Sequence, residues 1–78
     1  MYYKVYGKDG CEYCTLAVEL LEVLRKDYIY LVLNEDYCIE DFKEIFPNAT
    51  TVPQVIETTS GRLTKIGGYT ELKQHLGQ

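Results

Sequence analysis

The hydrophobic period of this chain changes from two residues to about 3.6 and back within its first half. Residues 2–6 alternate, which places Tyr3 and Val5 on one face of a predicted strand. Residues 12–26 have helical spacing, and residues 28–33 are apolar throughout and rich in β-formers. A strand, a helix and a strand in this order need a right-handed crossover and therefore parallel strands. We expect residues 28–33 to form a central strand covered on both faces.

A second helix is predicted from an apolar stripe in the middle of the chain. Pro47 ends this helix, because proline cannot continue the hydrogen-bond pattern of a helix interior. Asn34 or Asp36 can cap its start. The stripe consists of Ile39, Phe42, Ile45 and Phe46.

The last third of the chain predicts a hairpin followed by a short helix. Residues 54–58 and 62–66 flank the turn-forming residues 59–61. The last helix runs over residues 70–76, with Gly77 as its C-cap. The order β-α-β-α-β-β-α predicts an α/β fold of the thioredoxin-like kind, a mixed four-stranded sheet with helices on both faces.

The length and charge of the chain exclude several classes of protein. Its 78 residues have room for one core, so residues 1–78 are expected to form a single domain. The formal charge of −4 argues against nucleic-acid binding, which needs a clustered basic face. The sequence has neither an apolar run long enough to span a membrane nor the features of a signal peptide. We expect a cytoplasmic monomer without a membrane partner.

Acidic residues concentrate between positions 35 and 44. A solvated helix face is the simpler interpretation of this cluster, and a docking surface for a basic partner is the alternative. The cluster consists of Glu35, Asp36, Glu40, Asp41 and Glu44.

The most informative motif is the pair Cys11 and Cys14, which lies between the first predicted strand and the first predicted helix. Unpaired N–H groups at a helix N-terminus stabilise a thiolate at Cys11 and lower its pKa below the usual value of about 8.5. Cys14 lies about one turn further on and should face inward as a thiol. Cys11 is therefore the expected nucleophile, and Cys14 should resolve the mixed disulfide.

Two other interpretations of the cysteine pair are less favourable. A zinc site needs four ligands, and the chain adds only Cys38 and His75, both remote in sequence. A structural bond between Cys11 and Cys14 would close too short a loop to add much stability. We therefore prefer a redox dithiol and expect no metal.

Three segments of the chain resemble the signature segments of the dithiol glutaredoxins. They occur in the same order and cover nearly the whole chain. The segments are Lys8-Asp9-Gly10-Cys11-Glu12-Tyr13-Cys14, Thr51-Val52-Pro53-Gln54-Val55 and Ile66-Gly67-Gly68-Tyr69-Thr70-Glu71-Leu72. Thioredoxin itself would have Trp before the first cysteine and Gly-Pro between the two cysteines, and this chain has neither.

The resemblance implies a glutathione-dependent thiol–disulfide oxidoreductase that reduces protein disulfides and glutathione mixed disulfides. Cys11 and Cys14 would be catalytic, and the Val52–Pro53 bond would be cis, with the Val52 backbone pairing with glutathione like an added strand. Glutathione would be the reducing co-substrate, and ribonucleotide reductase is one client that the resemblance suggests. The implied glutathione-binding residues are Lys8, Tyr13, Thr51, Val52, Pro53, Gly68, Tyr69, Thr70 and Glu71.

The chain departs from the family pattern at two positions. Glu12 stands where the family usually has Pro, and its negative charge opposes a thiolate at Cys11. Glu71 stands where Asp is usual, which adds one methylene to a side chain expected near the γ-glutamyl ammonium group.

Two other functions stay open at this point. One is a thioredoxin-like reductant served by a flavoprotein reductase, which reduction by glutathione would distinguish. The other is a carrier of a glutathione-ligated [2Fe–2S] cluster between two protomers, because Glu12 removes the usual Pro; a brown colour on anaerobic purification would identify it.

Two further side chains have simpler interpretations. Cys38 is most simply a small hydrophobic residue at the start of a helix, with a regulatory thiol as the alternative. His75 is most simply a solvated residue near a helix C-terminus, where the helix dipole favours it.

Overall fold

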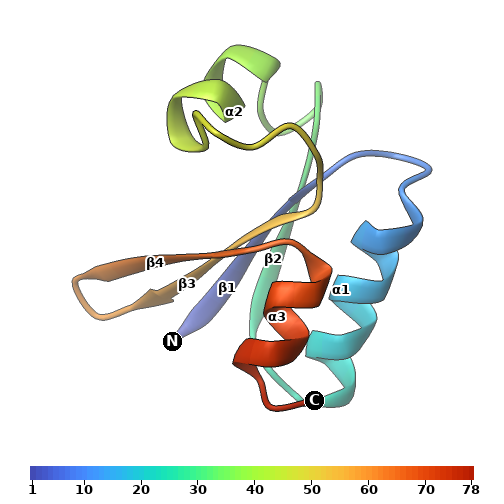
Figure 1. Cartoon of the computed structure of the whole chain (residues 1–78), viewed down its shortest axis with the longest axis vertical. Coiled ribbons are helices and arrows are strands. Elements are labelled where there is room, and N and C mark those ends of the chain that lie inside the picture. The colour runs from blue at the N-terminus through green and yellow to red at the C-terminus, as the bar shows by residue number, and fades with distance from the viewer.

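The computed structural model describes residues 1–78 as three helices and one four-stranded sheet (Figure 1). None of the helices is long and apolar enough to cross a membrane. The order of the elements confirms the predicted order. The strands are β1 (Tyr2–Gly7), β2 (Tyr28–Val32), β3 (Gln54–Thr59) and β4 (Arg62–Gly67), and the helices are α1 (Glu12–Val23), α2 (Ile39–Ile45) and α3 (Tyr69–His75).

The sheet is mixed, as predicted, with the strand order β2-β1-β3-β4. The β1 and β2 strands are parallel, whereas β3 is antiparallel to both β1 and β4. The expectation that the run at 28–33 is a central strand is wrong, because β2 lies at an edge and Ile29 is 47% exposed. Tyr28 and Tyr30 instead pack against the core on one face of the sheet. Leu31 and Leu33 pack against the buried residues of the opposite face, so the apolar run is partly covered on both faces although the strand lies at an edge.

Helices cover the two faces of the sheet, as predicted. Figure 1 shows α1 and α3 side by side, with α2 set apart at the top of the view. The first core cluster joins the sheet to α1 and α3 and contains Tyr3, Val5, Ala17, Leu21, Val55 and Leu72. The second lies on the opposite face, under α2, and contains Tyr6, Tyr37, Phe42, Phe46 and Ile56. Strand β1 therefore contributes to both clusters, with Tyr3 and Val5 in the first and Tyr6 in the second.

Helix α1 ends at Val23, earlier than the predicted residue 26. Arg25 adopts a left-handed φ of 58°, and its N–H bonds the carbonyl of Glu22. The N–H of Lys26 bonds the carbonyl of Leu21, which completes a helix stop of the kind usually made with glycine. Periodicity alone predicted a longer helix because the apolar pattern does not reveal where the backbone turns.

Helix α3 ends with the same arrangement around Gly77. Leu76 is the cap residue, and Gly77 follows it with a φ of 74°, so the predicted glycine lies one position beyond the cap. Its N–H bonds Gln74, and the N–H of Gln78 bonds Lys73.

The start of α2 differs from the prediction. Cys38, rather than Asn34 or Asp36, is the N-cap residue. The Asp36 carboxylate instead accepts the N–H of Val32 at 2.8 Å, within the turn that follows β2. Asn34 also belongs to this turn, with a φ of 69°. Short polar side chains stabilise turns as well as helix starts, so the sequence pattern did not separate the two roles.

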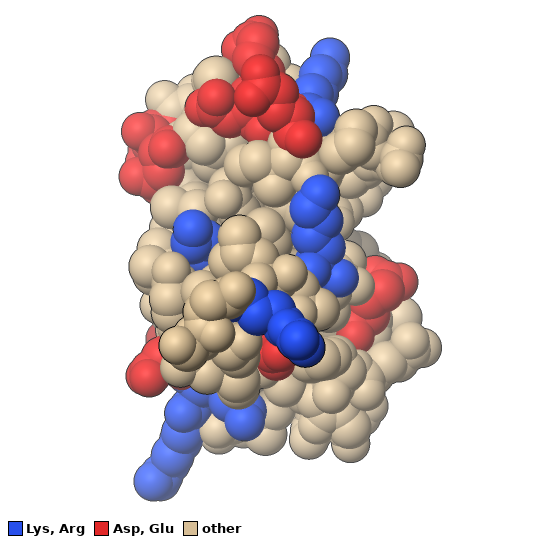
Figure 2. All heavy atoms as spheres, turned by 90° about the vertical axis from the view of Figure 1, so that its left-hand side faces the viewer, with Lys and Arg blue, Asp and Glu red and all other residues tan.

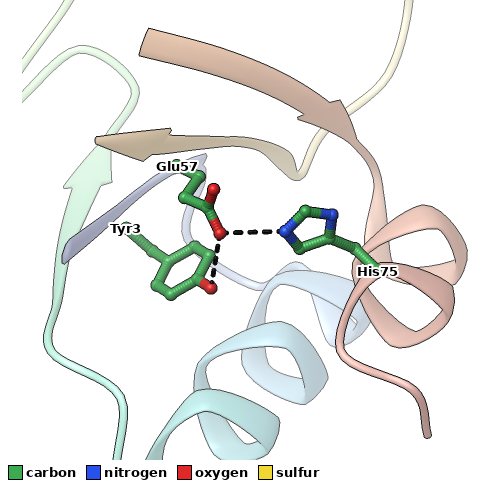
Figure 3. Close-up of polar contacts among 3 residues, drawn as sticks. All are labelled: Tyr3, Glu57 and His75. Carbon is green, nitrogen blue, oxygen red and sulfur yellow. Dashed lines mark hydrogen bonds and ion pairs between the residues drawn. The ribbon is translucent and has the colours of Figure 1, made fainter. Parts of the chain in front are cut away.

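A polar cluster of three residues joins β1, β3 and α3 (Figure 3). The Tyr3 hydroxyl donates to Oε2 of Glu57 at 2.9 Å, and Nε2 of His75 lies 2.9 Å from the same oxygen. His75 is exposed in the last turn of α3, as expected, and it is also paired with Glu57, which the sequence did not predict. Hydrogen bonds from His75 and then Tyr3 lower the pKa of Glu57. The stability that this cluster contributes is therefore complete above the ordinary pKa of a glutamate, and it is lost as the pH falls through the lowered pKa of Glu57.

We predict that Tyr3 and Tyr37 lose their protons only near pH 12. Burial is the main cause at both residues, and it raises the pKa of each to about 12. Because the unfolded chain releases these protons near pH 10, their contribution to stability is complete below pH 10 and is lost as the pH rises through 12. An absorbance titration of tyrosinate, alongside unfolding temperatures, tests this, with Tyr3→Phe removing one late step. A titration complete well below pH 12 in the folded protein would contradict it.

Both chain termini lie in the lower half of the view in Figure 1. The loop between β1 and α1, which leads to the cysteine pair, lies in the upper half together with α2. The ends of the chain and the loop that leads to the candidate site therefore lie in opposite halves of the view.

Candidate active site

Cys11 lies at the point where the β1–α1 loop enters the helix. It is the N-cap residue of α1, and its sulfur accepts a hydrogen bond from the N–H of Cys14 at 3.2 Å. The Cys11 carbonyl accepts the N–H of Thr15 at 3.1 Å, which starts the helical pattern. A sulfur in this position receives the positive end of the helix dipole, and such an environment favours the thiolate.

Cys14 lies below Cys11 on the inner side of α1. Its side chain is fully buried, whereas Cys11 is partly exposed. The two residues form a disulfide, with their Cα atoms 5.2 Å apart. This arrangement confirms the expected difference in exposure, with Cys11 available to substrates and Cys14 protected beneath it.

The loop before β3 lies opposite the cysteine pair. The Val52–Pro53 bond is cis, as the resemblance to glutaredoxins predicts. The carbonyl oxygen of Val52 lies 3.8 Å from Sγ of Cys11. Polar backbone atoms of this loop therefore border the reactive sulfur.

A surface groove of about 360 Å³ brings together eight of the nine residues predicted to bind glutathione. It runs between the Val52 loop and the start of α3. Its lining residues are Tyr13, Thr51, Val52, Pro53, Gly68, Tyr69, Thr70 and Glu71. Their role in binding stays a prediction, but their proximity means that one ligand could contact all of them.

Two aromatic rings and one carboxylate shape this groove. The rings of Tyr13 and Tyr69 lie 6.1 Å apart, and the Lys73 ammonium lies 5.7 Å from the centre of the Tyr69 ring. Oε1 of Glu71 accepts the N–H of Gly68 at 2.8 Å. The Glu71 carboxylate is therefore partly engaged at the start of α3, which the sequence did not predict.

Lys8, the ninth predicted residue, lines a second cavity together with Cys11 itself. This cavity measures about 370 Å³, and it shares Thr51 and Val52 with the groove. Its lining residues are Lys8, Cys11, Leu33, Tyr37, Ile39, Phe42, Thr50, Thr51 and Val52. The sequence did not reveal this cavity, because an apolar stripe does not show which of its members face an opening.

Gly7 is a further residue of the site that the sequence did not single out. Its carbonyl accepts the Tyr37 hydroxyl at 2.7 Å and the N–H of Leu33 at 2.9 Å. A Cβ atom at this position would lie 2.9 Å from Sγ of Cys14 and 2.6 Å from the Tyr30 ring. Only a residue without a side chain leaves room for the buried cysteine. The available signal was a glycine at the end of a strand just before the cysteine motif.

Cys38 lies outside the cysteine pair and is less suited to act as a nucleophile. A backbone hydrogen bond at Asp41 favours its thiolate, but the Asp41 and Glu40 carboxylates together with burial outweigh it and raise the pKa of Cys38. No group of three or more His, Cys, Asp or Glu side chains is placed to hold a metal ion.

We predict that Glu12→Pro lowers the pKa of Cys11. Glu12 is exposed at the first position of α1, where Pro breaks no hydrogen bond. A like charge about 6 Å from the sulfur costs the thiolate about 0.7 kcal/mol in water. Removing it should raise the reduction potential of the dithiol by about 15 mV, measured in glutathione redox buffers. Titration of thiolate absorbance checks the pKa. An unchanged or higher pKa in the variant would mean that Glu12 points away from Cys11.

Comparisons with known proteins agree with this site. The sequence profile of the glutaredoxin family matches residues 3–59, which include the cysteine pair and the Val52–Pro53 loop. No curated protein sequence matches the chain.

Two solved structures extend the likeness to the whole fold. Reduced Escherichia coli glutaredoxin is similar with a TM-score of 0.81 and 28% identity, over 99% of this chain and 94% of that one. Glutaredoxin 1 from Francisella tularensis, complexed with cacodylate, gives a TM-score of 0.72 and 24% identity, over 97% of this chain and 92% of that one. The active-site cysteine pair at the start of α1 makes the chain a thiol–disulfide oxidoreductase. Because the family profile spans well over half of the chain, the chain belongs to the glutaredoxin family.

Proposed function

We propose that this protein is a glutathione-dependent reductant of protein disulfides and glutathione mixed disulfides, acting as a monomer in the cytoplasm. The observation that carries the proposal is the groove along the Val52 loop, which gathers eight of the nine predicted glutathione-binding residues in one place. Disulfide-containing proteins are the proposed clients, and ribonucleotide reductase is a candidate among them.

The size and the backbone of the groove fit a short peptide. A tripeptide in extended form is about 10 Å long, and a groove of about 360 Å³ lies within the usual size range of small-molecule sites. The Val52 backbone borders the sulfur and can pair with a peptide backbone. The Thr51 and Thr70 hydroxyls can accept or donate hydrogen bonds at the rim, and Tyr13 is exposed enough to cover a bound ligand.

The cysteine pair carries out the reaction in two exchanges. The Cys11 thiolate attacks one sulfur of a substrate disulfide; the other substrate sulfur leaves and takes a proton. Cys14 then gives up its proton and attacks Cys11, which releases the second substrate sulfur and forms the Cys11–Cys14 disulfide. Two electrons have passed from the dithiol to the substrate. Glutathione supplies the two electrons that restore the dithiol.

A coupled assay tests the electron donor. The oxidised protein is mixed with glutathione, glutathione reductase and NADPH, and NADPH consumption is followed with a glutathione mixed disulfide as substrate. We expect turnover in this mixture and little turnover when a flavoprotein thioredoxin reductase replaces the glutathione system. The opposite result would assign the protein to the second class of donor.

A variant pair links this activity to the groove. Tyr13→Ala removes an exposed aromatic side chain from the groove and should raise the KM for glutathione without lowering the unfolding temperature. Val23→Ala alters a side chain on α1 that is 78% exposed and lines neither cavity, so its KM should equal that of the wild type. Equal KM values for both variants would place the glutathione site elsewhere.

A further inference from the structure

Cys14 has to ionise at a place that solvent does not reach. Its side chain is 0% exposed, and the hydrogen bonds at the cysteine pair involve the sulfur of Cys11 rather than that of Cys14. None of the buried residues is charged, and Figure 2 shows charged side chains at the surface of one face of the molecule. The second exchange nevertheless requires Cys14 to lose its proton and attack as a thiolate. A neighbouring polar group must therefore take the proton and stabilise the charge.

Tyr30 places a hydroxyl group beside the Cys14 sulfur. A Cβ atom added at Gly7 would lie 2.7 Å from the Tyr30 hydroxyl oxygen and 2.9 Å from Sγ of Cys14. Two atoms that both lie so close to one point are near neighbours, and glycine puts no side chain between them. The hydroxyl and the sulfur therefore border the same small space.

The Tyr30 hydroxyl also connects this space with the surface. It donates a hydrogen bond to the carbonyl oxygen of Lys8 at 3.1 Å, and this bond is exposed. The Tyr30 side chain as a whole is half-buried and packs against the first core cluster. A hydroxyl has one proton to donate and two lone pairs that accept, so it can hold the Lys8 carbonyl and accept the S–H of reduced Cys14 at the same time.

The groups around the hydroxyl keep it protonated at neutral pH. Burial and then the Asp9 carboxylate, from the loop before α1, raise the pKa of Tyr30. Tyr37, from the turn before α2, is neutral as well, because burial raises its pKa to about 12. Lys8 faces Tyr30 with its carbonyl and lines the second cavity, and α1 contributes Cys14. The hydroxyl is thus a neutral donor and acceptor between a buried thiol and the solvent.

We propose that the Tyr30 hydroxyl is the proton relay of Cys14. In the reduced protein its oxygen accepts the Cys14 S–H. As Cys14 attacks Cys11, the thiol proton passes to this oxygen and the hydroxyl proton passes to water. The bond between the two cysteine sulfurs forms, the bond from Cys11 to the substrate sulfur breaks, and the substrate thiolate takes a proton from water. When the disulfide is reduced, a proton returns to Cys14 by the same route.

This inference rests on the second exchange of the proposed function, but not on glutathione as the electron donor. Tyr30→Phe removes the hydroxyl and keeps the ring. Tyr28→Phe is the matched control, because Tyr28 lies two residues earlier on β2 and packs against the same core cluster. Its hydroxyl bonds the Glu22 carboxylate at 2.8 Å, so the control also loses one exposed hydrogen bond.

A single-turnover experiment without glutathione separates the two exchanges. All proteins carry Cys38→Ser, are reduced with dithiothreitol, freed of it and mixed with an excess of bis(2-hydroxyethyl) disulfide. Acid quenching and mass spectrometry follow the mixed disulfide, whose formation reports on Cys11 and whose decay reports on Cys14. Tyr30→Phe should slow the decay about tenfold at pH 7 and leave the formation at the wild-type rate. Tyr28→Phe should leave both rates unchanged.

The pH dependence distinguishes a proton relay from a structural role. Cysteine labelled with ¹³C at Cβ lets NMR follow the ionisation of Cys14 in the reduced proteins. Tyr30→Phe should raise the pKa of Cys14, so that its thiolate fraction at neutral pH falls about tenfold. The decay rates of the wild type and this variant should therefore approach each other as the pH rises. Unfolding temperatures of the two variants check that the fold is kept.

Two results would overturn the proposal. One is a Tyr30→Phe variant with the wild-type decay rate and an unchanged pKa of Cys14. The other is an equal slowing of formation and decay at every pH, which would mean that the hydroxyl only holds the loop before Cys11. Failure of the proposed electron donor has a different signature. Glutathione would then fail to reduce the oxidised protein, while the difference between Tyr30→Phe and Tyr28→Phe in the single-turnover experiment would persist.

Discussion

Cys11→Ser should abolish every thiol transfer by this protein. Cys11 is the only sulfur at the N-terminus of α1 that is exposed to substrates, and a serine hydroxyl does not ionise at neutral pH. The rate of reduction of a glutathione mixed disulfide should fall to the background of free glutathione. Cys38→Ser is the matched control and should keep wild-type activity, because the pKa of Cys38 is raised by the acids beside it.

Cys14→Ser should separate the two reactions of the site. Exchange with a glutathione mixed disulfide needs only Cys11 and should persist, whereas reduction of a protein disulfide needs Cys14 to resolve the intermediate and should be lost. Parallel assays with the two substrates measure this. If Cys14→Ser were inactive in both assays while Cys11→Ser stayed active, the assigned order of attack would be wrong.

Gly7→Ala should destabilise the protein and damage its redox site at once. The added methyl group would lie 2.6 Å from the Tyr30 ring and 2.9 Å from Sγ of Cys14, both far inside ordinary contact distance. Overpacking of this kind costs about 1–3 kcal/mol, which corresponds to a fall in unfolding temperature of about 10 °C for a domain of this size. Thermal unfolding followed by circular dichroism gives the stability. The reduction potential of the Cys11–Cys14 pair, measured in glutathione redox buffers, reports whether Cys14 has been displaced.

Gly61→Ala provides the comparison for this result. Gly61 has a left-handed φ of 73° but no atom within 4 Å of an added Cβ, so its cost comes from the backbone alone. It should lower stability by about 1 kcal/mol and leave the reduction potential unchanged. A Gly7→Ala variant that unfolds at the wild-type temperature, with an unchanged potential, would show that the site can make room for a methyl group.

The fold could be predicted from the sequence because local signals agreed with one another. The alternation along β1, the helical spacing before Val23 and the stop at Pro47 each mark an element through local chemistry. The positions of element ends were harder to predict. Arg25 stops a helix in a conformation that arginine rarely adopts, and Cys38 caps a helix in place of a nearby aspartate. Both choices depend on the path of the backbone, which periodicity does not describe.

The site was predictable where a motif ties chemistry to position. The spacing of Cys11 and Cys14 predicted two thiols at the start of a helix. The resemblance to glutaredoxins predicted the residues of the groove. The residues that the sequence did not reveal owe their roles to contacts that only the folded chain makes. The role of Gly7 depends on a sulfur seven residues away in the chain, and Ile39 lines an opening that forms only when α2 lies over the sheet. Pairing of His75 with Glu57 likewise joins two elements that are distant in sequence.

The position of the chain ends has a practical consequence. Both ends lie away from the loop that carries the cysteine pair (Figure 1). A protein anchored through either end, to a bead, an electrode or a neighbouring domain, would present its sulfur pair outward to the solution. A bead, electrode or domain attached at either end would therefore leave the cysteine pair accessible to the same disulfide substrates.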